Sequence, residues 1–213
     1  MKTSTVYYKG TRAEITPFLP KQYSKVLEIG CGKGGFRDNL DSNCEYWGVE
    51  PVESIAKISM EKLDKVLIGT FEDVKDQLPE NYFDLIICND VIEHMVDHDL
   101  FYKTIKEKMI SEAYMIGAIP NVRYLPNLYE LIRKKDWEYK QAGVLDRTHL
   151  RFFTEKSIKR DFINHNFEIE KLEGINGRVY TWSNKSDVFM NIMKMILGKD
   201  TQYLQFGFRI RIV

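Results

Sequence analysis

Five short apolar runs, each separated from the next by a stretch of helical character, constrain the fold of this chain most strongly. They span residues 25–29, 45–49, 65–68, 83–88 and 113–119. Alternating strands and helices are typical of a parallel sheet with helices on both faces. The runs FDLIIC and YMIGAI are continuously apolar, as expected of central strands that are covered on both sides. The sequence therefore predicts a doubly wound, mostly parallel α/β sheet.

The regular alternation of strands and helices stops after Pro120. Residues 121–153 are long, aromatic and basic, and they do not return promptly to a strand. Long insertions in compact domains are often lids or binding loops, so we expect this segment to cover a substrate. Thr154 to His165 then predicts a helix with Thr154 as its N-cap, and FEIEKLEGI and YLQFGFRIRIV predict two further strands.

A second helix is expected within residues 183–200, between the last two strands. It carries a stripe of apolar residues at helical spacing: Phe189, Ile192, Met193 and Ile196. Stripes of this kind more often pack on a core than bind a ligand, and we expect this one to pack on the core or a lid.

Length and composition indicate one domain over residues 1–213. The chain has 213 residues, of which 44% are hydrophobic, enough for one well-buried core. Its 31 basic and 31 acidic residues balance, so bulk charge offers no general attraction for nucleic acid or an anionic membrane. We expect a small-molecule partner and no nucleic acid.

No apolar run resembles a signal peptide or a membrane span, which predicts a cytoplasmic chain. The three cysteines lack C-x-x-C spacing, so we expect them to be structural.

A glycine pattern follows the first predicted strand. Gly30, Gly32 and Gly35 in VLEIGCGKGGF match G-x-G-x-x-G, which indicates a tight turn that opens a helix N-terminus toward a nucleotide. Glu50, twenty residues after Gly30, is placed to accept hydrogen bonds from a ribose. Dinucleotide-binding proteins have an acid at the same place, so Glu50 alone fits a dinucleotide too. Acidic and amide groups also follow the third and fourth strands, in GTFEDV and YFDLIICNDVIEH. They would repel a pyrophosphate.

Together these motifs resemble class I S-adenosylmethionine-dependent methyltransferases over nearly the whole chain. VLEIGCGKGG is similar to their first motif, and WGVEP, GTFEDV and FDLIICNDVIEHMVDHDLF are similar to those that follow. The resemblance implies a seven-stranded sheet with the last strand inserted antiparallel, and S-adenosylmethionine as cofactor. One departure is Thr70, where many members have an aspartate. The implied cofactor-binding residues are Glu28, Gly30, Cys31, Gly32, Gly35, Glu50, Pro51, Phe71, Glu72, Asn89 and Asp90.

Methyl transfer requires alignment and, for some acceptors, a base that removes a proton. We expect His94 and His149 as catalytic residues, because the first follows strand four and the second lies in the insertion. Asp90, Glu93 and His94 would share one face if their segment is helical. The structural alternative is that Glu93 and His94 fix the loop after strand four and that His149 anchors the lid by a backbone contact.

The segment D-x-x-E-H also resembles the E-x-x-E-H metal motif of certain small-RNA and ubiquinone-pathway methyltransferases. It makes Asp90, Glu93, His94 and His149 candidate metal ligands, although we expect no metal here, since histidines are more often structural or acid–base groups. His98 and His165 carry no pattern and are interpreted as surface or hinge residues.

The function that best fits is a methyltransferase acting on a small molecule or on a glycan or lipid precursor. AGVLDRTHLRFFT is similar to a segment of bacterial methyltransferases of that kind. We expect methylation of oxygen ahead of nitrogen or carbon. Two alternatives remain open at this point: a nicotinamide-dependent reductase, and a non-catalytic S-adenosylmethionine-binding regulatory protein.

Overall fold

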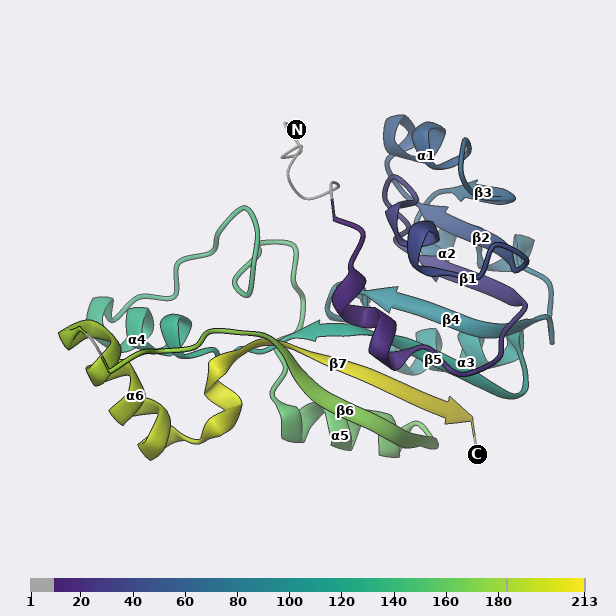
Figure 1. Ribbon diagram of the computed structural model, residues 1–213. Helices are drawn as coiled ribbons and strands as arrows, with labels where there is room; N and C mark the ends of the chain where they lie inside the picture. The colour runs from purple at the N-terminus through teal and green to yellow at the C-terminus, as the bar shows by residue number, and fades with distance from the viewer. Residues whose placement is uncertain (1–9, 183, 213) are drawn as a thin grey trace.

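Seven strands form one mixed sheet in the computed structural model, which describes residues 10–182 and 184–212 (Figure 1). Their order across the sheet is β3-β2-β1-β4-β5-β7-β6; β1 to β5 are parallel, and β7 is antiparallel to both of its neighbours. The predicted seven-stranded, mostly parallel sheet is confirmed. The strands are β1 (Lys25–Ile29), β2 (Glu45–Glu50), β3 (Lys65–Ile68), β4 (Phe83–Asn89), β5 (Met109–Pro120), β6 (Phe167–Gly177) and β7 (Tyr203–Ile212).

Residues of the central strands alternate between two apolar layers because successive side chains of a strand point to opposite faces. Ile86 of β4 packs in the layer under helices α3 (His98–Lys108) and α5 (Glu155–Asn164). Ile87, the next residue, packs in the opposite layer, against the 3₁₀ helix η1 (Ala13–Phe18). Both isoleucines are fully buried, which explains why β4 reads as a continuous apolar run.

The remaining helices of the described residues are short or lie outside these two layers. The α-helices are α1 (Glu53–Ser59), α2 (Phe71–Val74), α4 (Leu125–Lys134) and α6 (Lys185–Leu197). The 3₁₀ helices are η2 (Gly35–Asn39), η3 (Lys75–Gln77), η4 (Ile92–His94) and η5 (Lys199–Gln202). Thr154 caps α5 as predicted, in a reciprocal capping box with Ser157.

The helix after the glycine turn differs from the expectation. It is η2, a 3₁₀ helix of 5 residues, rather than an α-helix directed at the ligand. Gly34 and Gly35, followed by Asp38 and Asn39, have low helix propensity, which accounts for the short element. Charge near the glycine turn therefore comes from side chains and single amides, and not from a helix dipole.

The segment 121–153 leaves the sheet and returns to the same place. Asn121 bridges Phe153, and the Val122 amide donates to the Phe153 carbonyl over 2.9 Å. Between these points lie α4 and a long irregular stretch that arches beside the ends to which the arrows of β4 and β5 point (Figure 1). Helices α4 and α6 project together away from the sheet.

The apolar stripe of α6 was expected to pack on the core or a lid, and only part of it packs, on helix α4 of the insertion: Phe189 lies 5.8 Å from Tyr129 between ring centroids, and Met193 packs near Leu125. Phe189 and Ile192 are each 46% exposed and Ile196 is 73% exposed, while Met193 alone is half-buried. The buried face of α6 is formed instead by Met190 and Asn191. Of the predicted domain 1–213 and helix segment 183–200, residues 1–9, 183 and 213 lie outside the described residues.

The three cysteines, Cys31, Cys44 and Cys88, are buried free thiols, in agreement with their structural interpretation. Within residues 10–182 and 184–212, no helix has the length and apolar character needed to cross a membrane.

Candidate active site

A cavity of about 1000 Å³ lies at the sheet edge where β1, β2 and β4 end. This is the edge at which open α/β sheets bind their ligands. Its walls include every residue that the resemblance implies for cofactor binding: Glu28, Gly30, Cys31, Gly32, Gly35, Glu50, Pro51, Phe71, Glu72, Asn89 and Asp90. Their binding roles stay a proposal, but the fold brings all of them to one cavity.

The glycine turn forms the floor between β1 and β2. Gly30 and Gly32 both have positive φ, at 72° and 53°, in the left-handed region that glycine adopts without cost. The amides of Gly30 and Cys31 both donate to the Val49 carbonyl, at 2.8 and 3.0 Å. The turn is therefore tied to the end of β2.

Glu50 is fixed by the two backbone segments that flank the cavity. Its Oε2 accepts a hydrogen bond from the Gly32 amide and its Oε1 accepts one from the Val52 amide, each at 3.0 Å. Burial raises the pKa of this carboxyl, and the two amides oppose that shift. Two amide donors leave acceptor capacity on both oxygens, which suits the hydroxyl pair of a ribose.

Glu28 lies at the base of the cavity and is 4% exposed. Tyr46 donates its hydroxyl to Oε2, and the Asn89 side chain donates to Oε1 over 3.4 Å. Burial raises the pKa of Glu28 to about 7, against the effect of both hydrogen bonds. A cation entering the cavity would stabilise its ionised form.

Asp90 is held by residues that sequence reasoning did not assign. Its Oδ2 pairs with the guanidinium of Arg12, and its Oδ1 accepts from the Gln205 side chain. Arg12 precedes η1 and lines the cavity, and its Nη2 is buried with no hydrogen-bond partner among the described residues. No motif marks Arg12 or Gln205, because both reach the site from segments remote in sequence.

Thr70 and Phe71 form the wall beyond β3. Thr70 is the N-cap of α2, in a capping box with Asp73, so GTFEDV is a short helix and not an open loop. Phe71 is 3% exposed and packs its ring edge-on against Phe101, with centroids 5.2 Å apart. Many family members have an aspartate at the position of Thr70, and in this chain Thr70 caps helix α2.

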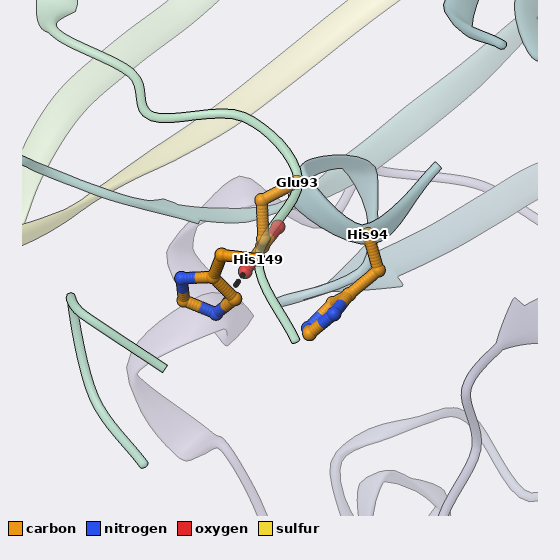
Figure 2. A group of neighbouring side chains, drawn as sticks. All are labelled: Glu93, His94 and His149. Carbon is orange, nitrogen blue, oxygen red and sulfur yellow. Dashed lines mark ion pairs between the residues drawn. The ribbon is translucent and has the colours of Figure 1, made fainter. Parts of the chain in front are cut away.

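A cluster of Glu93, His94 and His149 stands beside this cavity (Figure 2). His149 Nε2 lies 3.7 Å from Glu93 Oε1, and the two imidazole rings meet edge-to-face with centroids 4.8 Å apart. His94 lines the cavity, whereas Glu93 and His149 lie behind it. The insertion reaches the cavity through Gln141, Ala142, Asp146, Arg147 and Thr148.

The expectation that Asp90, Glu93 and His94 share a helical face is wrong. Asp90 has φ 55°, outside any helix, and only residues 92–94 form the 3₁₀ turn η4. The side chain of Asp90 consequently turns to Arg12, while Glu93 and His94 meet His149.

Backbone carbonyls select the tautomer of both imidazoles in their neutral form. His94 Nδ1 donates to the Thr148 carbonyl over 3.0 Å, and His149 Nδ1 donates to the Val144 carbonyl over 3.1 Å. A carbonyl only accepts, so Nδ1 carries the proton and each Nε2 keeps a lone pair in the neutral ring. These contacts are also the loop-fixing contacts that the structural alternative for the two histidines predicts.

Glu93 is 1% exposed, and neither carboxyl oxygen has a hydrogen-bond partner among the described residues. Burial raises its pKa well above the ordinary value, and the nearby charge of Asp90 adds to the shift. Burial also lowers the pKa of His149, as does His94. The acid and the imidazole therefore both favour their neutral forms.

Three of the four metal candidates come together. One ligand atom from each of Glu93, His94 and His149 lies within 4.8 Å of the other two. Ligand atoms around a bound zinc ion lie about 3.5 Å apart, so the group would have to contract to hold a cation. Asp90 is not part of this group. The expectation of no metal stays a prediction.

His98 was interpreted as a surface or hinge residue, and its burial shows that the surface interpretation is wrong. It is 5% exposed, donates from Nε2 to the Ile92 carbonyl over 2.9 Å, and approaches Asp161 to 3.4 Å. His165 is half-buried at the end of α5, where Nε2 lies 2.8 Å from Asp99 Oδ1. Both histidines join α3 to α5 and lie outside the cavity.

The cavity fits S-adenosylmethionine by its volume and its polar groups. Ligand cavities commonly enclose about 300 to 1000 Å³, so this one has room for a cofactor and an acceptor together. Glu28 has a carboxyl that a bound cation would ionise, and Glu50 offers paired acceptors to a ribose. The cofactor has no phosphate, and its sulfonium and ammonium outweigh its single carboxylate, so its net positive charge suits these acids.

Comparison with known proteins agrees with this fit. A family model described as a methyltransferase domain matches residues 7–172. The chain belongs to this methyltransferase family. It is an S-adenosylmethionine-dependent methyltransferase, as predicted, and S-adenosylmethionine is its cofactor. The reductase and the non-catalytic regulatory protein, the two alternatives, are set aside.

Individual relatives of the methyltransferase are distant. The ubiquinone biosynthesis O-methyltransferase of Bradyrhizobium diazoefficiens is 24% identical over 185 residues, which cover 82% of this chain and 71% of that protein. The (S)-coclaurine N-methyltransferase of Papaver somniferum is 28% identical over 127 residues, 55% of this chain and 35% of that protein. The crystal structure of a SAM-dependent methyltransferase from Archaeoglobus fulgidus has a TM-score of 0.67 at 20% identity and covers 96% of both chains. This last likeness shows the fold alone.

Proposed function

We propose that this methyltransferase transfers a methyl group to an oxygen atom of a small molecule or of a glycan or lipid precursor. The observation that carries the proposal is His94, which lines the cavity with a free Nε2 lone pair because its Nδ1 proton is bound by Thr148. A hydroxyl needs a base when it is methylated, whereas a neutral amine already has a reactive lone pair. The O-methyltransferase among the relatives supports the same reading.

In the proposed reaction the cofactor supplies the methyl group. The acceptor oxygen forms the new bond to that methyl as the methyl–sulfur bond breaks, and His94 Nε2 takes the hydroxyl proton. Glu50 and the glycine turn hold the cofactor in place. His149 does not line the cavity, so we assign it a positioning role: it supports His94 by ring packing at 4.8 Å.

The insertion 121–153 is proposed to cover the acceptor. Five of its residues line the cavity, among them Arg147 and Thr148 beside His94. A cavity of this kind suits a small molecule, so no nucleic acid is assigned as substrate. Three buried free thiols are typical of a reducing compartment, which supports the cytoplasm as the place of this activity.

The test is turnover of His94→Ala, measured as release of the demethylated cofactor with a panel of phenols, sugars and hydroxy acids. Loss of general-base help lowers turnover by about 10²-fold or more, while the cofactor Kd stays nearly unchanged. His165→Ala is the matched control, because His165 lies outside the cavity, and it should keep the parental turnover.

Parental turnover in His94→Ala would remove this histidine from the mechanism. Measuring the metal content of the protein distinguishes a metal-ligand role of Glu93, His94 and His149 from the proposed base role of His94. A ligand role requires a stoichiometric divalent ion and turnover that a chelator abolishes, and the proposed base role requires neither.

A further inference from the structure

The outward face of helix α6 is apolar over most of its length. Phe189 and Ile192 are 46% exposed, Met195 is 75% exposed and Ile196 is 73% exposed. Half-buried Val188 completes this set, which we call the α6 apolar face. The five positions lie within a sector of about 120° on a helical wheel, which is apolar from Val188 to Ile196 and has Lys185 at its N-terminal end. A helix of a globular domain ordinarily turns such a face inward.

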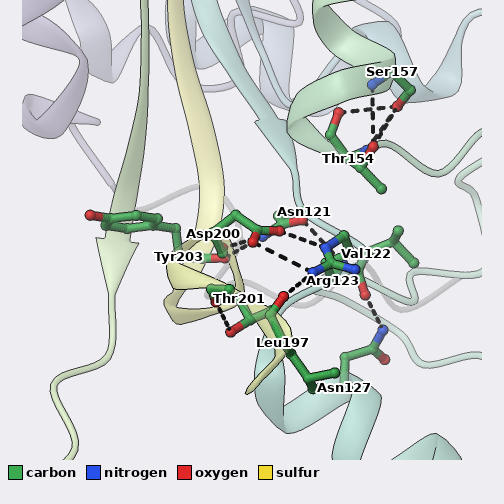
Figure 3. Close-up of polar contacts among 11 residues, drawn as sticks. Asn121, Val122, Arg123, Asn127, Thr154, Ser157, Leu197, Asp200, Thr201 and Tyr203 are labelled. Carbon is green, nitrogen blue, oxygen red and sulfur yellow. Dashed lines mark hydrogen bonds and ion pairs between the residues drawn. The ribbon is translucent and has the colours of Figure 1, made fainter. Parts of the chain in front are cut away.

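Contacts on the opposite side hold α6 in this orientation. The buried Asn191 side chain donates to the carbonyls of Tyr180 and Thr181, at 2.9 and 3.1 Å. Figure 3 shows Arg123 bound to the Leu197 carbonyl at the end of α6 and to Asp200 just beyond it, at 2.5 Å each. The helix cannot turn its apolar face inward without breaking these bonds and burying their polar groups unpaired.

Basic side chains lie at both ends of α6 and at the end of the neighbouring helix α4. Lys185 begins the helix and Lys199 follows its end, and both are exposed. Arg133 and Lys135 are exposed at the end of α4, which packs alongside α6 through Tyr129 and Phe189. None of these four cations pairs with an acid within residues 10–182 and 184–212. Of the acids near these cations, Asp200 is bound to Arg123, Asp187 accepts hydrogen bonds from Thr181 and keeps its charge, and Asp136 is exposed beside Lys135.

From this arrangement we propose that α6 docks the enzyme on an anionic lipid surface. An apolar helix face bordered by lysine and arginine is the pattern of helices that lie in a bilayer interface, with side chains inserted about 5 to 10 Å and cations on the lipid phosphates. Exposed Trp182, just before α6, is a residue type enriched at that depth. The proposal is independent of the methyl acceptor.

A second copy of the chain fits this face less well. Two α6 helices packed antiparallel would place Lys185 of each copy beside Lys199 of the other, and parallel packing would place Lys185 beside Lys185. Either arrangement brings these lysines together at both ends of the contact, where like charges repel. Lipid phosphates complement the same lysines.

Co-sedimentation with vesicles tests the proposal. The parent should bind vesicles of equal parts phosphatidylglycerol and phosphatidylcholine, and bind pure phosphatidylcholine at least tenfold more weakly. The double variant Ile192→Ser, Ile196→Ser should bind the mixed vesicles at least tenfold more weakly than the parent, since it loses two inserted side chains. Ile163→Ser is the matched control on α5, where Ile163 is 62% exposed, and it should bind like the parent.

A second variant guards against a folding defect. Lys185→Glu, Lys199→Glu leaves the apolar residues in place and should abolish the preference for anionic vesicles. Thermal melting and cofactor affinity should match the parent in both variants, because all four positions are exposed and distant from the cavity lining. The proposal is overturned if the parent does not bind the mixed vesicles, or if the serine and glutamate variants bind them as the parent does. A parental dimer that the serine variant dissolves, without vesicle binding, would overturn it in favour of a contact between copies.

Discussion

Burial raises the pKa of Glu28 to about 7, from an ordinary value of 4.5. Between these two pH values the folded chain keeps a proton on Glu28 that the unfolded chain has lost. The free energy of unfolding therefore falls as pH rises from 4.5 to about 7, and the contribution of the protonated carboxyl is complete only below 4.5. At roughly 1.4 kcal/mol per pKa unit, the loss is about 3 kcal/mol.

Replacement of Glu28 by glutamine should remove this dependence, because the amide does not titrate. We expect the parent, without cofactor, to lose about 3 kcal/mol more stability than Glu28→Gln between pH 4.5 and 7. Urea denaturation at several pH values measures the difference. Glu61→Gln, at an exposed position, is the control and should follow the parent. Parallel stability curves for the parent and Glu28→Gln would show that Glu28 ionises normally.

At the scale of elements, helix η1 packs closely against β7 at a glycine, which has no side chain. Gly207 of β7 faces the ring of Phe18, the last residue of η1, and a Cβ built on Gly207 would lie 2.4 Å from that ring. Arg209 of β7 also donates to the Leu19 carbonyl just after η1, at 2.9 Å. Because Gly207 allows this close approach, η1 covers the face of the sheet opposite helices α3 and α5.

Gly207→Ala should destabilise the protein by about 1 to 3 kcal/mol, because Phe18 would have to move from a fully packed position. The effect should shrink to within about 0.5 kcal/mol in a Phe18→Ala background, where no ring meets the new methyl group. Urea denaturation of the four proteins of this cycle measures the coupling. Additive effects would mean that the alanine at residue 207 acts through the strand backbone and not through Phe18.

Elements with a strong local pattern were predictable from the sequence. The β4 run and the Thr154 cap depend on neighbouring residues alone, so periodicity and capping chemistry locate them. The facing of α6 was not predictable, because its apolar stripe is typical of a core helix, and only the contacts of Asn191 and Arg123 turn that stripe outward.

Some residues of the site were predictable from local motifs and others were not. Local motifs mark Glu28, the glycine turn and Glu50, and the structure brings them to one cavity. Arg12 lines that cavity and Gln205 binds Asp90 behind it; both come from distant segments and have no motif. The backbone of Asp90 also escapes prediction, since its positive φ breaks the helical face that the D-x-x-E-H spacing implies.

At the scale of the whole molecule, three distant parts of the chain close one cavity. The sheet supplies the glycine turn and Glu50, the N-terminal segment supplies Arg12, and the insertion supplies Arg147 and its neighbours (Figure 1). The cofactor should therefore meet groups from the sheet, and the acceptor should meet the insertion. The claim that depends on all of this is that the cavity holds S-adenosylmethionine, with Glu50 on its ribose.

Calorimetric titration with S-adenosylhomocysteine, the demethylated cofactor, tests that claim most directly. We predict micromolar binding to the parent, roughly 8 kcal/mol, and no binding of NADH. Glu50→Ala should bind more weakly by about 1 to 3 kcal/mol, because it loses a charged acceptor and leaves the Gly32 and Val52 amides unpaired. Glu61→Ala, outside the cavity, should bind like the parent. Parental affinity in Glu50→Ala would contradict the ribose contact, and tight NADH binding without any response to S-adenosylhomocysteine would contradict the account of the cavity as a whole.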